Sequence, residues 1–171
     1  LFLKIKFKLQ KNKMKFHTLK VAQSEKLTPL SKKLTFEVPD SLQNDYQFQS
    51  GQYVTLDLEV NGSKVKRSYS ICSSPAIKNQ FSIGIKQIEN GLVSTFINQN
   101  TNQNDTISVS TPEGSFKIET ISNDRQYVFV AGGSGITPIL SMLYDILPKI
   151  NSKIILKYST LTQEETMFFQ E

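Results

Sequence analysis

The chain has 171 residues, 38% hydrophobic and 20% charged, which suits a globular protein of one domain or of one domain and part of another. Its one cysteine, Cys72, excludes an internal disulfide framework, and the single histidine, His17, adds too few soft ligands for a zinc or iron–sulfur site. No apolar run approaches the ~20 residues of a membrane span, so we expect no membrane span and a cytoplasmic location.

The net charge of +5 comes from the N-terminal end. Residues 1–13, LFLKIKFKLQKNK, hold five lysines and no acid, and the rest of the chain balances 15 basic against 15 acidic residues. This balance predicts no nucleic-acid surface. Lysines interrupt every apolar stretch of 1–13, which excludes a signal peptide. We therefore expect 1–13 to be a basic extension outside the fold, either a dispensable arm or translated sequence upstream of Met14.

Short alternating segments separated by turn residues follow from Met14 to about Glu119. Six strands are expected, at 16–23, 32–39, 52–60, 65–73, 81–88 and 106–118. The pair Asn61-Gly62 predicts a tight hairpin between the third and fourth strands. The segment GLVSTFINQ, 91–99, suits a short helix. The pattern predicts a closed or nearly closed antiparallel β-barrel over residues 14–120.

A different pattern begins after the linker 121–126. The run YVFVA, 127–131, is continuously apolar and predicts a buried parallel strand. A glycine turn and a helix with apolar residues at 139, 143 and 146 follow, and KIILKYS, 153–159, predicts a second buried strand. QEETMFFQE reads as the start of another helix. Residues 126–171 are therefore expected to be a partial α/β nucleotide-binding domain built on one βαβ unit.

The turn GGSGITP, 132–138, is a candidate phosphate site. Thr137 suits the N-cap and Pro138 the first helical position. Glycines allow a ligand to approach the backbone, and the positive end of the helix suits a pyrophosphate. The turn matches neither a P-loop nor the GxGxxG fingerprint. Alone, it supports a nucleotide site and a ligand-free tight turn equally well.

The segment RSYSICSSP, 67–75, carries polar side chains where a buried strand would be apolar. Arg67 and Tyr69 share a face in a strand, and this pair suits a ligand with a phosphate and a flat ring. For this segment alone, a surface strand with an exposed arginine and a core tyrosine is the better interpretation. Strict alternation turns Ser70 away from Tyr69, so a twist or bulge is needed to bring both to one ligand.

The motifs SGQYVTL, RSYS, GLVS and GGSGITP occur in this order across the predicted barrel and βαβ unit. The ordered set resembles the ferredoxin–NADP reductase family of flavoprotein reductases. FHTLKVAQ and RSYSICSSP are most similar to the reductase components of phenylacetyl-CoA epoxidase and related oxygenases. The resemblance covers about residues 16–171; each motif alone is weak, and the ordered set is specific.

The resemblance implies the roles of individual residues. Arg67 would bind the flavin phosphate, Tyr69 would stack on the isoalloxazine, and Ser70 would bond near its reactive N5, which makes Tyr69 and Ser70 the candidate catalytic residues. The remaining cofactor-binding candidates are Gly91, Leu92, Val93 and Ser94 for the flavin pyrophosphate, and Gly132, Gly133, Gly135, Thr137 and Pro138 for the nicotinamide nucleotide.

The implied function is a flavoprotein oxidoreductase that passes electrons from NADPH or NADH through FAD to an iron–sulfur centre or a partner such as an oxygenase or ferredoxin. The alternatives are a stand-alone flavin or flavodoxin reductase and a non-catalytic flavin-binding barrel. Ser159-Thr160-Leu161 replaces the usual Gly-Asn-Arg, which leaves the choice between NADPH and NADH open. We expect a C-terminally truncated chain, with a [2Fe–2S] cluster only in the missing part.

Overall fold

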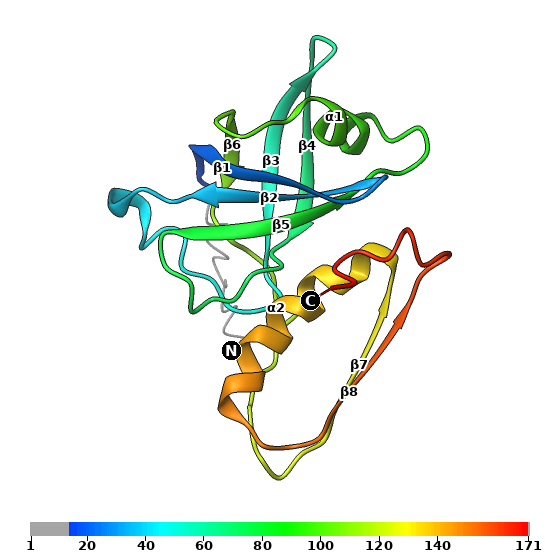
Figure 1. Cartoon of the computed structure of the whole chain (residues 1–171). Coiled ribbons are helices and arrows are strands. Elements are labelled where there is room, and N and C mark those ends of the chain that lie inside the picture. The colour runs from blue at the N-terminus through cyan, green and yellow to red at the C-terminus, as the bar shows by residue number, and fades with distance from the viewer. Residues whose placement is uncertain (1–13, 171) are drawn as a thin grey trace, which may run out of the picture.

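The computed structural model describes residues 14–170, so the basic stretch 1–13 lies outside the described residues (Figure 1). Six antiparallel strands form the first unit: β1 (Phe16–Thr28), β2 (Ser31–Glu37), β3 (Tyr53–Val60), β4 (Ser63–Ser70), β5 (Gln80–Lys86) and β6 (Thr106–Ser110). They pair in the order β4-β3-β6-β1-β2-β5. The two edge strands meet at a bridge between Ile71 and Ile83, which closes the barrel at one end.

The barrel interior follows the period-two pattern of the sequence. Inward residues such as Leu34, Phe36, Ile83 and Ile85 are at most 1% exposed. Full burial of each such side chain contributes about 1.5–3 kcal/mol, so the alternation stabilises the closed sheet. The hairpin at Asn61-Gly62 is confirmed, since β3 and β4 flank it and both residues have positive φ, as a tight two-residue turn requires.

The short helix predicted at 91–99 is present as α1 (Leu92–Asn100), between β5 and β6. Its buried face, formed by Val93, Ser94 and Ile97, packs on the barrel. The carbonyl of Thr101 at its C-terminal end accepts hydrogen bonds from Lys32 Nζ at 2.7 Å and Ser24 Oγ at 3.0 Å. A cation at a helix C-terminus is favourable, so β1 and β2 fix this end of α1.

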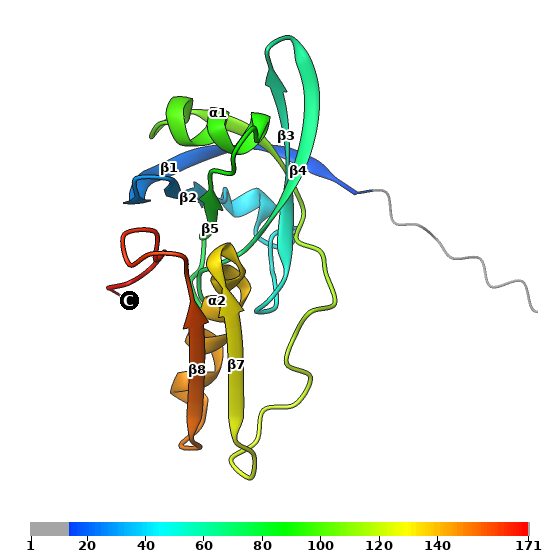
Figure 2. The same ribbon diagram turned by 90° about the vertical axis from the view of Figure 1, so that its right-hand side faces the viewer.

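The second unit is the predicted βαβ arrangement. It contains β7 (Tyr127–Gly132), a 3₁₀ turn (Gly133–Gly135), α2 (Ile136–Ile146), a second 3₁₀ turn (Leu147–Lys149) and β8 (Ile154–Ser159). The two strands are parallel, and Figure 2 shows them side by side. A third 3₁₀ turn, Asp40–Leu42, lies in the barrel. The fold class predicted from the sequence, a barrel followed by a small α/β unit, is confirmed.

The predicted burial of both parallel strands is wrong. Val128 is 59% exposed, Val130 72% and Leu156 41%. Within residues 14–170 this sheet has two strands and α2 covers one of its faces, so alternate side chains face outward. The predicted helix start near the C-terminal end is also wrong. Residues 161–170 form bends and turns, with Met167 fully buried beneath them.

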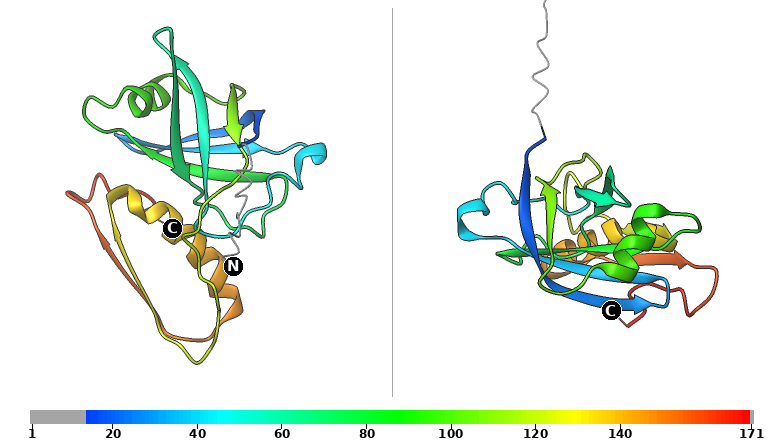
Figure 3. Two further views of the ribbon diagram at one scale, coloured as in Figure 1. Left: turned by 180° about the vertical axis from the view of Figure 1, so that it is seen from behind. Right: turned by 90° about the horizontal axis from the view of Figure 1, so that it is seen from above.

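The barrel and the βαβ unit are joined by specific contacts with α2, which lies against the barrel (Figure 3). Ser141 Oγ donates to the Ser73 carbonyl at 2.7 Å, and Ser50 Oγ donates to Asp145 at 2.8 Å. Gly84 of β5 faces the start of α2, where an added Cβ would lie 2.8 Å from Thr137 Cγ2. In the described part of the chain, no helix is both long and apolar enough to cross a membrane.

Candidate functional site

A cavity of about 640 Å³ opens where β4 and β5 diverge from the Ile71–Ile83 bridge. Its walls come from β4, β5, the start of α1 and the start of α2. The lining residues are Arg67, Ser68, Tyr69, Ser70, Gly84, Lys86, Ile88, Asn90, Gly91, Leu92, Val93, Ser94, Ser134, Gly135, Thr137 and Pro138. The fold therefore brings together ten of the twelve candidate residues, which lie in three separate segments of the sequence; Gly132 and Gly133 do not line the cavity.

The β4 wall contains Arg67, Tyr69 and Ser70 together, although neighbouring residues of a strand point to opposite faces. No bulge brings them together, because β3 and β4 pair in unbroken register from Val60–Ser63 to Tyr53–Ser70. Instead, β4 is an edge strand of the sheet order, and the cavity lies along the edge that faces β5. A ligand at a strand edge meets the backbone and side chains from both faces.

Tyr69 is a half-buried phenol within this wall. It packs against the barrel core, and burial raises its pKa to about 12, while the neighbouring Arg67 charge opposes the shift. Tyr69 is therefore neutral and able to donate a hydrogen bond at neutral pH. Arg67 is exposed, and its Nη1 donates to the Lys66 carbonyl at 2.8 Å.

The start of α1 offers backbone donors to the cavity. The first amides of a helix have no intrahelical partners, and Gly91, the N-cap, has no side chain to cap them. The Ser94 hydroxyl donates to the Gly91 carbonyl and accepts from the Ile88 amide, both at 3.2 Å, and so holds the turn itself. A Cβ at residue 91 would lie 2.3 Å from Ile88 Cγ1. Glycine thus allows this turn to pack tightly.

The glycine turn after β7 forms the opposite wall. The predicted N-cap role of Thr137 is wrong, because α2 begins at Ile136 with Gly135 at the N-cap. Thr137 Oγ1 instead donates to the Ser134 carbonyl at 2.9 Å. The 3₁₀ turn shifts the helix start by two residues, and Pro138 is tolerated there because early helical amides need no intrahelical partner. A Cβ at Gly135 would meet no atom within 4 Å, so this turn faces open space.

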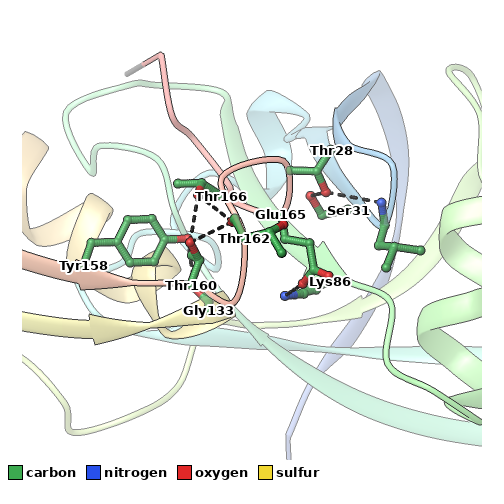
Figure 4. A network of polar contacts seen from close by, with 10 residues as sticks. Thr28, Ser31, Lys86, Gly133, Tyr158, Thr160, Thr162, Glu165 and Thr166 are labelled. Atoms are coloured by element: carbon green, nitrogen blue, oxygen red, sulfur yellow. Dashed lines mark hydrogen bonds and ion pairs between the residues drawn. The ribbon is translucent and has the colours of Figure 1, made fainter.

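Sequence reasoning missed Ser68, Gly84, Lys86, Ile88, Asn90 and Ser134 as lining residues. A glycine within a strand can mark a close backbone approach, and this signal could have identified Gly84. No comparable feature of the sequence marks Lys86 as a lining residue, because its position depends on an ion-pair partner that only the fold brings close. Its Nζ lies 2.6 Å from the Glu165 carboxylate of the segment after β8 (Figure 4).

The charges around the cavity suit an anion. Arg67 and Lys86 are cationic, and none of the described lining residues is acidic. Glu165 offsets the Lys86 charge from outside the lining. Tyr158 of β8 donates its hydroxyl hydrogen to the Gly133 carbonyl at 3.1 Å, which ties the glycine turn to the second strand (Figure 4). The site thus combines a cation, free helical amides and an aromatic ring, as binding of a phosphate-bearing aromatic cofactor requires.

Comparison with known proteins matches residues 18–118 to the model of the oxidoreductase FAD-binding domain. The chain is 35% identical over 157 residues to one component of the 1,2-phenylacetyl-CoA epoxidase of Escherichia coli (strain K12), covering 91% of this chain and 44% of that protein. It is 42% identical over 95 residues to the glycine betaine monooxygenase reductase subunit of Pseudomonas aeruginosa (strain UCBPP-PA14), covering 56% of this chain and 26% of the relative.

Among solved structures, phthalate dioxygenase reductase, described as modular for electron transfer from pyridine nucleotides to [2Fe–2S], matches with a TM-score of 0.76 and 30% identity. The match covers 91% of this chain and 47% of that chain. The chain thus spans less than half the length of these relatives.

Proposed function

Since the chain belongs to the oxidoreductase FAD-binding domain family of ferredoxin reductase-like proteins, we propose that it binds FAD in the cavity between β4, β5, α1 and α2. In the proposed reaction, electrons pass from NAD(P)H through FAD to an iron–sulfur centre or an oxygenase partner. One observation carries this proposal. Residues distant in sequence, from Arg67 to Pro138, surround a single cavity of about 640 Å³ whose described lining carries two cationic side chains and no acidic one.

The phosphates of FAD are assigned to Arg67 and the start of α1. Arg67 is a permanent cation with a planar donor fork, which suits phosphate oxygens. The amides of Leu92 and Val93 lie at the positive end of a nine-residue helix without intrahelical partners. Ser94 positions these amides through its bonds to Gly91 and Ile88.

The isoalloxazine is assigned to the part of the cavity beside Tyr69 and Ser70. The Tyr69 phenol is neutral at neutral pH, and burial raises its pKa further, so it can pack beside a flat ring without adding a negative charge. Ser70 lies at the end of β4 nearest the bridge and supplies a hydroxyl there. FAD supplies the hydride and single-electron chemistry when bound, and the protein positions its ring and limits access of water.

The nicotinamide nucleotide is assigned to the turn that contains Gly133, Ser134 and Gly135. This turn faces the flavin wall across the cavity and precedes an 11-residue helix. Its open glycine surface allows a pyrophosphate to approach the backbone. Thr160 and Leu161 follow β8 without an arginine, so both NADH and NADPH remain candidate donors.

Absorption spectroscopy tests the proposal. The purified chain, incubated with FAD and passed through a desalting column, should retain a flavin spectrum with stoichiometry near one. Anaerobic addition of NADH or NADPH, followed by a one-electron acceptor such as ferricyanide, tests transfer into and out of the flavin. A folded chain that retains no flavin would overturn the assignment.

A further inference from the structure

The short turn before β3, made of Ser50, Gly51 and Gln52, contacts both units of the fold. The Gln52 carbonyl accepts a hydrogen bond from the Ile71 amide at 2.9 Å, directly after the end of β4. The buried Ser50 donates its hydroxyl hydrogen to the Asp145 carboxylate of α2 at 2.8 Å. The turn therefore connects the β4 wall of the cavity to the helix that follows the opposite wall.

A hydrogen bond from α2 to the segment after β4 closes a ring with these two contacts. Ser141 Oγ donates to the Ser73 carbonyl at 2.7 Å. Ser141 is 0% exposed, and a buried hydroxyl is costly unless it is bonded, so this bond is a specific one. Ser141 precedes Asp145 by one helical turn, which places both bonds on one face of α2. Figures 1 and 2 show α2 near the ends of β3 and β4 where these contacts meet.

Gly51 allows the turn, the linker and α2 to approach one another. Its φ is +94°, and an added Cβ would lie 2.0 Å from the Phe116 carbonyl oxygen and 2.4 Å from Met142 Cε. Both separations are below 3.0 Å, so any side chain at this position must push the linker or α2 away. Gly62 also has positive φ, at +75°, but an added Cβ there would meet nothing within 4 Å.

These contacts connect the two walls of the cavity. Tyr69 and Ser70 come directly before Ile71 in the chain, and the Gly133–Gly135 turn runs directly into α2. A movement of α2 relative to the end of β4 therefore changes the separation of the two walls. Reaction between groups held on separate elements falls steeply when one is misplaced by about 1 Å.

We propose that Ser50, Gly51 and Ser141 are positioning residues that set the separation between the β4 wall and the Gly133–Gly135 turn. None of the three lines the cavity, so they act through the elements that do. The placement of the walls follows from contacts within the protein, whereas its effect on electron transfer rests on the proposed function.

Residual dipolar couplings of the backbone amides test the placement without any cofactor. In wild type, one alignment tensor should fit the barrel and the βαβ unit together. In the double variant Ser50→Ala/Ser141→Ala, the couplings of the βαβ unit should no longer fit the barrel tensor. Ser110→Ala is the matched control, because Ser110 is also 0% exposed and bonds to Thr55 and Thr111 of the barrel. Separate tensors in wild type, or a single tensor in the double variant, would overturn the proposal.

The glycines provide an independent comparison by the same measurement. Gly51→Ala should make the couplings of the βαβ unit misfit the barrel tensor, because the added Cβ meets the linker and α2. Gly62→Ala carries a similar backbone strain in open space and should leave the common tensor unchanged. Since Gly51→Ala can reduce folding, the serine variants keep the proposal falsifiable.

Rapid mixing of the FAD-loaded chain with NADH or NADPH separates positioning from binding. Ser50→Ala/Ser141→Ala should lower the limiting rate of flavin reduction about tenfold and leave the dissociation constants for FAD and the nucleotide within twofold. Equal rates in the double variant and Ser110→Ala would overturn the positioning role. A wild type that binds no flavin, or whose flavin neither nucleotide reduces, would instead refute the proposed function, and the dipolar couplings would still decide the placement.

Discussion

The Lys86 ammonium lies 2.6 Å from the Glu165 carboxylate, and this ion pair joins the last barrel residue of β5 to the segment that follows β8. Both side chains are mostly buried, 17% and 27% exposed, so the pair is screened less by solvent than an ordinary surface pair. It lies at the boundary between the two units and beside the cavity. Its contribution to joining them can be measured directly.

Glu165→Gln should lower the free energy of unfolding by about 1 kcal/mol, because it leaves the mostly buried Lys86 without a counter-charge. Urea unfolding of wild type, Glu165→Gln, Lys86→Met and the double variant gives the coupling energy. The matched control is Glu164→Gln, since Glu164 is the adjacent exposed acid. A coupling energy of zero would show that this ion pair does not help to join the two units.

Arg67→Ala should weaken FAD binding by about 1.5–3 kcal/mol through loss of a charge-assisted contact to phosphate. Lys64→Ala is the matched control, because Lys64 is an exposed cation on the same strand and does not line the cavity. Cys72→Ser, at a buried position on the same segment, should leave the dissociation constant nearly unchanged. Fluorescence titration measures all three, and equal losses for Arg67→Ala and Cys72→Ser would contradict the assigned role of Arg67.

Gly84→Ala and Gly135→Ala should have opposite effects on stability. A Cβ at Gly84 would lie 2.8 Å from Thr137 Cγ2 and 3.0 Å from Met167 Cε, so the start of α2 must move away from β5. Such overpacking costs about 1–3 kcal/mol. At Gly135, φ is −63° and a Cβ meets nothing within 4 Å, so alanine should be neutral or stabilising by up to about 1 kcal/mol. Thermal unfolding distinguishes the two, and equal melting temperatures would be the contrary result.

Alkaline pH should destabilise the fold through Tyr69, whose pKa burial raises to about 12. The folded protein holds the phenolic proton more tightly than the unfolded chain, so this contribution is complete below pH ~10 and is lost as the pH rises towards 12. Tyr46, whose pKa burial also raises, contributes in the same direction. Urea unfolding between pH 9 and 12 should show a shallower decline in Tyr69→Phe than in wild type, and identical profiles would argue against a buried phenol.

Val130→Lys should increase the solubility of the chain without unfolding it. Val130 is 72% exposed beside the 59% exposed Val128 on the open face of the β7–β8 sheet, and charge on such a face opposes aggregation. Phe129→Lys is the contrasting variant, because Phe129 is 8% exposed in the core beneath α2 and should not tolerate a charge. Light scattering and soluble yield measure both. No gain in solubility for Val130→Lys would exclude this face as the source of self-association.

The sequence predicted the fold well where local pattern and burial agree. Alternation identified the six barrel strands, Asn61-Gly62 identified the hairpin, and GLVSTFINQ identified α1. The prediction that the strand at 127–131 is fully buried was wrong because a continuous apolar segment does not show which elements cover each face of the strand. Val128 and Val130 are therefore exposed while Phe129 and Ala131 are buried.

The candidate site was predictable in its residues and less so in its geometry. Sequence spacing cannot show that a cavity lies along a strand edge, which is why a twist or bulge seemed necessary to bring Ser70 and Tyr69 to one ligand. Thr137 was misassigned because α2 begins directly after the 3₁₀ turn Gly133–Gly135, two residues earlier than the Thr-Pro pair predicts. The place of Lys86 beside the cavity could not be predicted from the sequence because its partner, Glu165, lies 79 positions away.

The gap between β4 and β5 gives the barrel an open seam, with the two edges touching at the Ile71–Ile83 bridge. Unpaired strand edges are templates for pairing with another chain. In the proposed site a flavin would lie along β4 and cover that edge, so the cofactor would protect the edge from pairing with another chain. Under this proposal the apoprotein would self-associate more readily than the flavin-loaded protein, because only the apoprotein exposes the β4 edge.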